Sequence, residues 1–282
     1  MNLTSPTIVR ALCAEIGCTP SKVLGQNFLI DRNILDIIIE ASVVKSTDVV
    51  LEVGPGLGVV TRELAAFART VWAVEKDRRL ADYLAREFAV TPNVHVIESD
   101  FLVLAPDTYG GDTLDAMISN LPFVSGSRIL MELFIRRTPL DRITVTVQYE
   151  VAERLAAGPG TAARGLLGVM AQSLYAVTIV HKIGPTCFYP RPKVDSAIVS
   201  MRLRLGHVGE CRRRQFLLDL VKTAFSFRRK QMGVVLSRYR PGLARDQIEA
   251  ILRQAGIDPH LRPEALTNTE WMGLVDTLDA IT

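Results

Sequence analysis

Short apolar runs and amphipathic stretches alternate along the first half of the chain. The apolar runs, which are rich in β-branched residues and have the length of buried strands, cover 48–53, 71–75, 94–97, 114–119 and 143–147. Apolar residues recur at helical spacing in the stretches around them, at 31–42, 57–67, 77–88 and 129–136. Asp31 and Asp77 stand where two of these helices would begin. Strands separated by helices of this length predict an α/β fold with a doubly wound, mostly parallel sheet.

The pattern changes after Val151. Residues 152–157 have helical spacing, and 177–181 and 197–205 have the character of strands. The second of these strands alternates apolar and polar residues, which predicts an antiparallel strand added at the edge of the sheet. Pro190, Pro192 and Lys193 indicate an extended loop between the two strands.

Only helical periodicity is visible from about residue 209 to the end of the sequence. We therefore predict two domains, an α/β domain over 1–206 and a small helical domain over 207–282, with the boundary near Gly206. The length of 282 residues and the hydrophobic content of 48% suit this division, because each part can bury a core of its own.

Composition excludes several classes of protein. No apolar stretch has the length of a membrane span, and residues 1–16 lack a basic start followed by an uninterrupted apolar core, so we expect a cytoplasmic protein without a secretory signal. The cysteines are scattered without metal-ligand spacing and the histidines form no paired motif, so we expect reduced thiols and no metal site; the cysteines are Cys13, Cys18, Cys187 and Cys211.

The net charge of +3 conceals an uneven distribution of charge. Residues 201–240 contain eleven Lys and Arg residues against Glu210 and Asp219, whereas the rest of the chain has 22 basic and 28 acidic residues. Phe225 and Phe227 lie among these cations. A basic segment with interleaved aromatic residues favours a polyanionic partner, in particular nucleic acid, over an ordinary solvated helix face.

The tetrad Asn120-Leu121-Pro122-Phe123 follows one of the predicted strands. An Asn side-chain oxygen and a backbone carbonyl of such a turn can accept hydrogen bonds from an exocyclic amine, which favours the pyramidal amine needed for methyl transfer. The aromatic residue offers a face on which a base can stack. Taken alone, the same tetrad also suits a turn that simply ends a strand.

A glycine-rich turn, Gly54-Pro55-Gly56-Leu57-Gly58, links the first predicted strand of the sheet to the next helix. Its spacing is not that of a dinucleotide fold, and Pro55 removes an amide that would bind pyrophosphate. Glu75 and Asp100 follow the next two strands, where ribose hydroxyls and an adenine amine would be bound. An acidic site that disfavours phosphate suits S-adenosylmethionine better than NAD.

Several stretches together resemble the ribosomal RNA adenine N6,N6-dimethyltransferase family, which methylates two adjacent adenines near the 3′ end of small-subunit rRNA. They span almost the whole chain in the order of the family; the stretches are 25–31, 51–58, 74–77, 99–100, 120–123, 148–155, 188–197 and 224–230. Residues 124–127 and 164–168 depart from the family pattern, and Phe123 stands where many relatives have Tyr.

The resemblance implies a Rossmann-like methyltransferase domain over 1–206 and an RNA-binding helical domain over 207–282. It implies that S-adenosylmethionine is bound by Asn27, Leu29, Gly54, Glu75, Asp100 and Asn120. Asn120 and the Pro122 carbonyl would hold the adenine N6 amine, while Phe123 and Phe188 would sandwich the adenine ring. Arg228, Arg229 and Lys230 would bind rRNA, and the family implies a substrate within a pre-assembled 30S-type particle.

Two other functions remain open at this point. One is the related large-subunit rRNA adenine methyltransferase of the macrolide-resistance type, although the Gly54–Gly58 turn, Leu121 and Lys193 favour the small-subunit branch. The other is a non-catalytic RNA-binding assembly factor on the same scaffold, which the presence of Glu75, Asp100 and Asn120 disfavours. A small-molecule or protein-amide methyltransferase would leave the basic segment unexplained.

Overall fold

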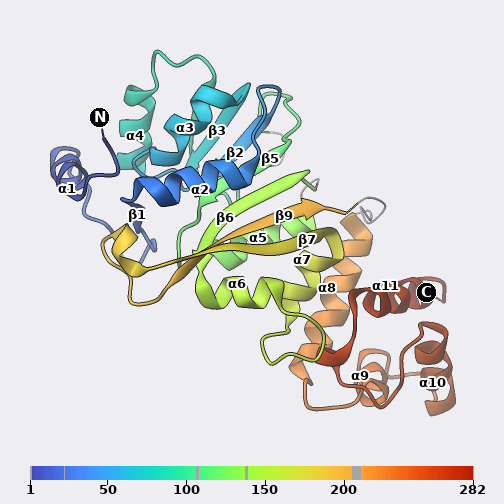
Figure 1. Cartoon of the computed structure of the whole chain (residues 1–282). Coiled ribbons are helices and arrows are strands. Elements are labelled where there is room, and N and C mark those ends of the chain that lie inside the picture. Colours follow the sequence, from blue (N-terminus) through green and yellow to red (C-terminus); the bar gives the residue numbers. More distant parts are fainter. Residues whose placement is uncertain (1, 22, 106–107, 137–138, 205–210, 282) are drawn as a thin grey trace. The chain divides into compact units, whose positions relative to one another are not determined.

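The computed structural model, which describes residues 2–21, 23–105, 108–136, 139–204 and 211–281, contains a seven-stranded sheet (Figure 1). The strand order is β4-β3-β2-β5-β6-β9-β7. The strands are β2 (Val49–Val53), β3 (Thr70–Glu75), β4 (Val94–Glu98), β5 (Ala116–Asn120), β6 (Arg142–Gln148), β7 (Tyr175–Ile183) and β9 (Ser196–Leu203). The strands from β4 to β6 in this order, which are β4, β3, β2, β5 and β6, are parallel, and this confirms the predicted α/β fold class.

The prediction for the strand near residues 197–205 is right about its direction and wrong about its position. β9 pairs antiparallel with β6, from Gln148 opposite Ser196 to Arg142 opposite Arg202. It is not an edge strand, because β7 lies beyond it at the edge of the sheet. Accordingly residues 196–199 are all buried, while β7 alternates exposed and half-buried positions along 176–180. The alternation in sequence therefore did not identify which strand faces solvent.

Helices pack on this sheet where the sequence predicted them. Helix α2 contacts β6, α3 contacts β3, and α4 contacts β4; their bounds are Arg32–Ser42, Val59–Phe67 and Arg78–Glu87. The two predicted caps are confirmed, since Asp31 accepts a hydrogen bond from the Ile34 amide at 3.1 Å and Asp77 accepts one from the Arg79 amide at 3.0 Å. Further along lie α5 (Gly126–Arg136) and α6 (Tyr149–Ala156).

Two helices were missed from the sequence, α1 (Pro6–Glu15) and α7 (Leu166–Leu174). Helix α7 is buried at every position except Leu166 and Gln172, so it has no polar face to give a helical period. A small second sheet was also missed, in which β1 (Phe28–Leu29) pairs antiparallel with β8 (Phe188–Tyr189). Two-residue strands leave too short a pattern to recognise in sequence.

Buried polar contacts tie the strands together at the amino ends. Asp48 forms an ion pair with Arg142, and both side chains are buried. The Asp115 carboxylate accepts a hydrogen bond from the Val49 amide at 2.7 Å. These contacts fix the register between β2, β5 and β6, so that Asn120 lies opposite Thr146 at the carboxyl ends of β5 and β6.

Residue contacts divide the chain into two compact units. The sheet unit comprises Met1–Leu130, Leu140–Ala152 and Val177–Leu203, and the helical unit comprises Met131–Pro139, Glu153–Ala176 and Arg204–Thr282. The helical unit contains α7 and the helices α8 (Cys211–Ser226), α9 (Met232–Tyr239), α10 (Arg245–Gln254) and α11 (Asn268–Asp279). The predicted boundary near Gly206 lies outside the described residues, and the division into domains at that point stays a prediction. None of the described helices is long and apolar enough to cross a membrane.

Candidate active site

A cavity lies in the sheet unit at the carboxyl ends of β2, β3 and β5. Its wall combines the glycine turn after β2, the residues after β3 and β4, the first three residues of the tetrad at the end of β5, and the segment 23–29; Phe123 does not line it. The wall includes seven of the residues predicted from sequence to form the site: Asn27, Leu29, Gly54, Glu75, Asp100, Asn120 and Pro122. The parallel register explains why residues so far apart in sequence meet at one rim.

The glycine turn is held close to the tetrad. Gly54, Gly56 and Gly58 have φ angles of 72°, 60° and 81°, which favour glycine. A Cβ atom on Gly54 would lie 2.9 Å from Cγ of Pro122, so a side chain there would push the turn away from the tetrad. The two motifs therefore form adjoining walls of one cavity.

Glu75 is a buried carboxylate that organises the turn around it. Its oxygens accept hydrogen bonds from the Gly56 amide at 3.1 Å and the Asp77 amide at 2.8 Å. Burial raises the pKa of Glu75 to about 7, although these amide hydrogen bonds act in the opposite direction. The carboxylate keeps further lone pairs, so it can still accept hydrogen bonds from ligand hydroxyls.

Glu52 is a second buried carboxylate in the cavity wall, and sequence analysis missed it. It accepts a hydrogen bond from the Thr61 hydroxyl at 2.6 Å. Burial raises the pKa of Glu52 to about 8, and the nearby Glu75 carboxylate adds to that shift. The sequence carried one signal, because Glu52 is the single carboxylate in the otherwise apolar run 49–53. A central strand that is buried along its whole length has no exposed face for such a side chain.

Asp100 lies at the mouth of the cavity and is already engaged. Its oxygens accept hydrogen bonds from the Lys76 ammonium at 2.7 Å and from the Leu102 amide at 3.0 Å. The Lys76 hydrogen bond holds the pKa of Asp100 below its usual value. Asp100 is therefore kept ionised and oriented as an acceptor, as a contact with an adenine amine requires.

The segment 25–27 lies directly against the tetrad. The Gly25 carbonyl accepts a hydrogen bond from the Phe123 amide at 3.2 Å, and the Asn27 carbonyl accepts one from Nδ2 of Asn120 at 3.0 Å. Glycine allows this close approach, because a Cβ on Gly25 would lie 2.6 Å from the Val124 amide nitrogen and would force the segment away from the tetrad. The Gln26 side chain is anchored separately, to Asp77 at 3.1 Å.

These contacts fix the orientation of the Asn120 amide. Because a carbonyl can only accept a hydrogen bond, Nδ2 must face Asn27. The other end of the amide, Oδ1, is buried and has no hydrogen-bond partner among the described residues. A buried acceptor without a donor costs about 1–3 kcal/mol, so this oxygen marks the place where a ligand donor would fit.

The backbone of the tetrad differs from the prediction at Pro122. The Pro122 carbonyl accepts hydrogen bonds from the Ser125 amide at 3.1 Å and the Gly126 amide at 2.8 Å. Both lone pairs of this oxygen are therefore used in the first turn leading into α5, and it is poorly available to an adenine amine. The preceding carbonyl, that of Leu121, accepts no hydrogen bond within the described part of the chain.

The two predicted stacking residues contact each other. The ring centroids of Phe123 and Phe188 lie 5.9 Å apart with an interplanar angle of 73°, an edge-to-face arrangement that leaves no parallel slot between the rings. Phe188 is only 2% exposed and belongs to the apolar core of the sheet unit, where it lies opposite Leu29 in the small second sheet. Phe123 is half-buried, so part of its ring is accessible.

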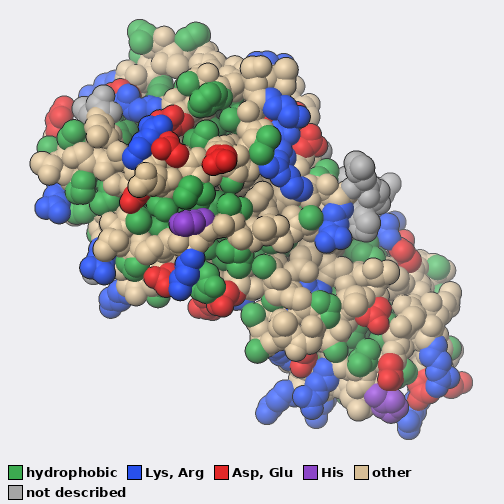
Figure 2. All heavy atoms as spheres, in the orientation of Figure 1, with side chains coloured by type: hydrophobic (Ala, Val, Ile, Leu, Met, Phe, Trp, Pro, Cys, Tyr) green, Lys and Arg blue, Asp and Glu red, His purple; other side chains and the backbone are tan. Residues whose placement is uncertain are grey.

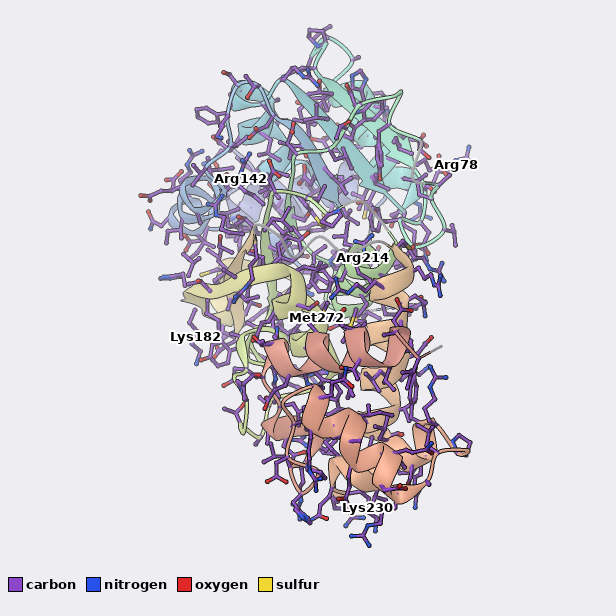
Figure 3. The ribbon with its side chains drawn as sticks, turned by 90° about the vertical axis from the view of Figure 1, so that its right-hand side faces the viewer. Arg78, Arg142, Lys182, Arg214, Lys230 and Met272 are labelled. Atoms are coloured by element: carbon purple, nitrogen blue, oxygen red, sulfur yellow. The ribbon has the colours of Figure 1, made fainter. Side chains whose placement is uncertain are left out.

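The predicted RNA-binding residues follow α8 in the helical unit, and they are not equivalent. Arg228 donates to the Ala162 carbonyl at 2.9 Å and lies 3.8 Å from Glu264, so it fastens the chain near residue 162. Arg229 and Lys230 are exposed and form no ion pair within the described residues. Lys230 projects from the lower end of the helical unit in Figure 3.

Much of the remaining basic segment is used within the fold. Arg213 pairs with Asp276, Arg214 is buried, and Arg238 stacks over the Phe227 ring at 4.3 Å. Arg164, in a segment that departs from the family pattern, is also buried and donates to the Ala157 carbonyl at 2.8 Å. A count of cations in the sequence therefore overstates the charge available to a partner, even though Lys and Arg side chains gather along the lower edge of the helical unit (Figure 2).

The fold and this cavity define a Rossmann-like methyltransferase. A family model described as ribosomal RNA adenine dimethylase matches residues 19–279. The curated "Ribosomal RNA small subunit methyltransferase A" of Pelotomaculum thermopropionicum is 38% identical, covering 99% of this chain and 98% of that protein. The protein of the same name from Shouchella clausii is 36% identical over 98% of this chain and 96% of its own. The chain belongs to the ribosomal RNA adenine dimethylase family, which confirms the resemblance seen in its motifs.

Solved structures agree with this placement. A dimethyladenosine transferase from Plasmodium falciparum has the same fold, with a TM-score of 0.76 over 89% of this chain and 97% of that one at 22% identity. The 23S rRNA methyltransferase ErmE has a TM-score of 0.67 and 30% identity, covering 90% of this chain and all of its own. Among the described residues, no group of three or more His, Cys, Asp or Glu side chains is placed to hold a metal ion.

The raised pKa of Glu52 predicts a measurable dependence of stability on pH. The unfolded chain releases the Glu52 proton above about pH 4.3, whereas the folded protein keeps it up to about pH 8, so stability falls as pH rises through this interval. We expect Glu52→Gln, which keeps an acceptor for Thr61, to gain stability relative to the wild type by at most about 1.4 kcal/mol per pH unit.

Urea unfolding at pH 5, 6, 7 and 8 tests this expectation. The control is Glu63→Gln, because Glu63 is a more exposed carboxylate that pairs with Arg32 on the surface. A difference between Glu52→Gln and wild type that stays constant over this range would show that Glu52 ionises normally in the folded protein.

Proposed function

We propose that this protein uses S-adenosylmethionine to dimethylate the N6 amines of two adjacent adenines near the 3′ end of small-subunit rRNA. The curated relatives described above match this chain over nearly their whole length and are named small-subunit rRNA methyltransferases, which supports the proposed substrate. The observation that carries the proposal is the buried, unpartnered Oδ1 of Asn120, a residue that lines the cavity. That oxygen suits the N–H group of an adenine amine.

The tetrad would act by orienting and polarising the amine. Asn120 Oδ1 would accept a hydrogen bond from one amine N–H group, and we assign the second acceptor to the Leu121 carbonyl rather than to the engaged Pro122 carbonyl. Two acceptors favour the pyramidal amine whose lone pair attacks the methyl group, and they stabilise the positive charge that develops on nitrogen. Because Asn27 already holds the Asn120 amide, little reorganisation is needed when the base arrives.

The residues around the cavity fit S-adenosylmethionine. Glu75 would accept hydrogen bonds from the ribose hydroxyls, Asp100 would accept one from the adenine amine, and Gly54 would allow close approach of the backbone. Asn27, Leu29 and Asn120 would line the methionine end. When bound, this cofactor supplies a methyl group activated by the positive sulfonium. The carboxylates in the wall would favour a cation at that position.

The target adenine must leave its stack to reach the cavity. Phe123, which is partly accessible, would support the extruded ring. Phe188 is a core residue in this structure, and for it to form the second side of a sandwich its contact with Phe123 would have to open. Phe188 therefore serves first to position Phe123.

The helical unit would contribute to rRNA binding through Arg229 and Lys230, whose exposed charges can contact phosphates. Arg228 would act indirectly, by holding the segment near Ala162. We further propose that the substrate is the rRNA within a pre-assembled 30S-type particle in the cytoplasm. The large-subunit methyltransferase remains the alternative to be tested, because the ErmE structure is also similar.

The direct test of the proposed function is to incubate the purified full-length protein with unmethylated small-subunit particles, naked small-subunit rRNA and large-subunit rRNA. Mass spectrometry of the rRNA fragments should show two adjacent dimethyladenosines near the small-subunit 3′ end only when S-adenosylmethionine is present. Methylation confined to large-subunit rRNA would contradict the proposal. Failure of calorimetry to detect S-adenosylmethionine binding would instead favour a non-catalytic assembly factor.

Replacing Asn120 should affect turnover more than cofactor affinity. We expect Asn120→Ala to lower kcat by about 100-fold or more, because the amine contact strengthens in the transition state, and to change the Kd for S-adenosylmethionine only a few-fold. Single-turnover kinetics and calorimetry measure the two effects. Asn93→Ala is the control, since that side chain bonds the Ala65 and Ala68 carbonyls and does not line the cavity. Equal losses in kcat and in cofactor binding would refute the role of Asn120.

Replacing Arg228 should have a different effect from replacing Arg229 and Lys230. The double variant Arg229→Ala/Lys230→Ala should weaken rRNA binding and reduce the slope of log affinity against log salt by about 1.5, since each phosphate contact contributes about 0.7–0.9. Arg228→Ala should instead lower the thermal unfolding midpoint and leave the slope nearly unchanged, because its guanidinium bonds the chain itself. The assignment would be reversed if Arg228→Ala reduced the salt slope more than the double variant does.

A further inference from the structure

A second basic surface lies on the sheet unit, outside the cavity. Residues 181–195 contain three Lys or Arg residues against one acidic residue, Asp195. All three cations are exposed, and Arg191 and Lys193 form no ion pair in the described part of the chain. A fourth exposed cation, Arg10, lies 5.4 Å from the ring centroid of Tyr189. We define the basic strip as Arg10, Tyr149, Lys182, Tyr189, Arg191 and Lys193.

Lys182 is held in place although it is on the surface. Its ammonium lies 4.6 Å from the ring centroid of Tyr149 and 2.8 Å from the Asp195 carboxylate, and its side chain is 55% exposed. The Asp195 carbonyl in turn accepts a hydrogen bond from the Tyr149 amide at 2.9 Å. A positioned ammonium loses less conformational entropy when it binds an anion, and an exposed ion pair such as Lys182–Asp195 is weak enough to open.

The basic strip adjoins the tetrad by two independent routes. Tyr149 follows β6, three residues after Thr146, which lies opposite Asn120 in the sheet. At about 3.3 Å per residue, Tyr149 is therefore roughly 10 Å along the chain from that pair. Tyr189 directly follows Phe188, whose ring contacts Phe123. The loop 190–195 carries Arg191 and Lys193 and joins the two tyrosine–cation pairs.

We propose that the basic strip binds the phosphates of the single-stranded RNA that flanks the target adenines. This inference rests on the proposed function and assigns it a contact surface on the same unit as the cavity. An extruded base can stay in its pocket only if the backbone beside it is held, and phosphate contacts from positioned cations provide that hold. Tyr149 and Tyr189 act by orienting Lys182 and Arg10, in the way that aromatic rings and cations combine in single-strand binding surfaces.

A matched control is available on the same unit. Arg78 is exposed at 80% and pairs only loosely with Asp82 at 3.9 Å, and it does not line the cavity. Figure 3 shows Arg78 and Lys182 on opposite sides of the sheet unit. Replacing Arg78 therefore removes a cation that is more exposed than Lys182 without touching the basic strip.

The test uses the full-length triple variant Lys182→Ala/Arg191→Ala/Lys193→Ala and unmethylated small-subunit particles as the substrate. We expect the KM for particles to rise about tenfold or more, with kcat within twofold and the Kd for S-adenosylmethionine unchanged. The slope of log affinity against log salt should fall by about 2, so that raising salt from about 50 to about 200 mM costs the variant about 15-fold less affinity than the wild type. Arg78→Ala should match the wild type in all four quantities.

An unchanged KM and salt slope in the triple variant, with unchanged thermal unfolding, would overturn the proposal, as would a fall in kcat alone. Failure of the proposed function is distinguishable, because the wild type would then methylate no particles. In that case filter binding of wild type and triple variant to a 3′-terminal small-subunit rRNA fragment decides: equal affinity and equal salt slope overturn the basic strip as an RNA contact.

The role of the ring is tested separately at Tyr149. Tyr149→Leu removes the face that orients Lys182 and should raise the KM for particles about two- to fivefold, the value of one exposed cation–π contact. Tyr149→Phe keeps the face and should behave as the wild type. If Tyr149→Leu has the wild-type KM, or if Tyr149→Phe is equally impaired, the orienting role of the ring is wrong.

Discussion

The hydrogen bond between the Asn120 amide and the Asn27 carbonyl is the contact on which the site depends. It joins the end of β5 to a segment more than ninety residues earlier in the chain, and the Phe123–Gly25 backbone hydrogen bond runs beside it. Together they decide which end of the Asn120 amide is bonded within the chain and which end is left without a partner. An isolated strand end would leave that amide free to rotate, and its oxygen would then be only one of several surface acceptors.

The cavity also concentrates carboxylates in a buried place, which is unfavourable when it holds no cation. Glu52 and Glu75 both have raised pKa values for this reason, while Asp100 is kept ionised by Lys76. A bound cation would reduce the cost of ionising the two buried groups. The buried carboxylates therefore favour a positively charged donor, while hydrogen bonds from the Thr61 hydroxyl and the Gly56 and Asp77 amides stabilise their ionised forms.

Cations in this chain fall into those that build the fold and those that remain available. Arg142 and Arg164 are buried, and Arg228 donates to a backbone carbonyl, so these side chains stabilise the fold and are not available to a partner. Arg229, Lys230 and the cations of the basic strip remain exposed. The two exposed groups lie on different units of the chain, Arg229 and Lys230 in the helical unit and the basic strip in the sheet unit. Binding RNA through both would fix the target segment as well as the bulk of the particle.

The sequence alone determined the sheet fold, the two capped helices after Asp31 and Asp77, and the polar residues that meet at one rim. These follow from local periodicity and from the rule that parallel strands share their carboxyl ends. Only the tertiary structure decided that β7 rather than β9 is the edge strand, that the Pro122 carbonyl is engaged, and that Phe188 is packed in the core. Those outcomes depend on which groups become neighbours after folding, and residue type carries no record of whether a carbonyl, a ring or a guanidinium will find its partner inside the chain.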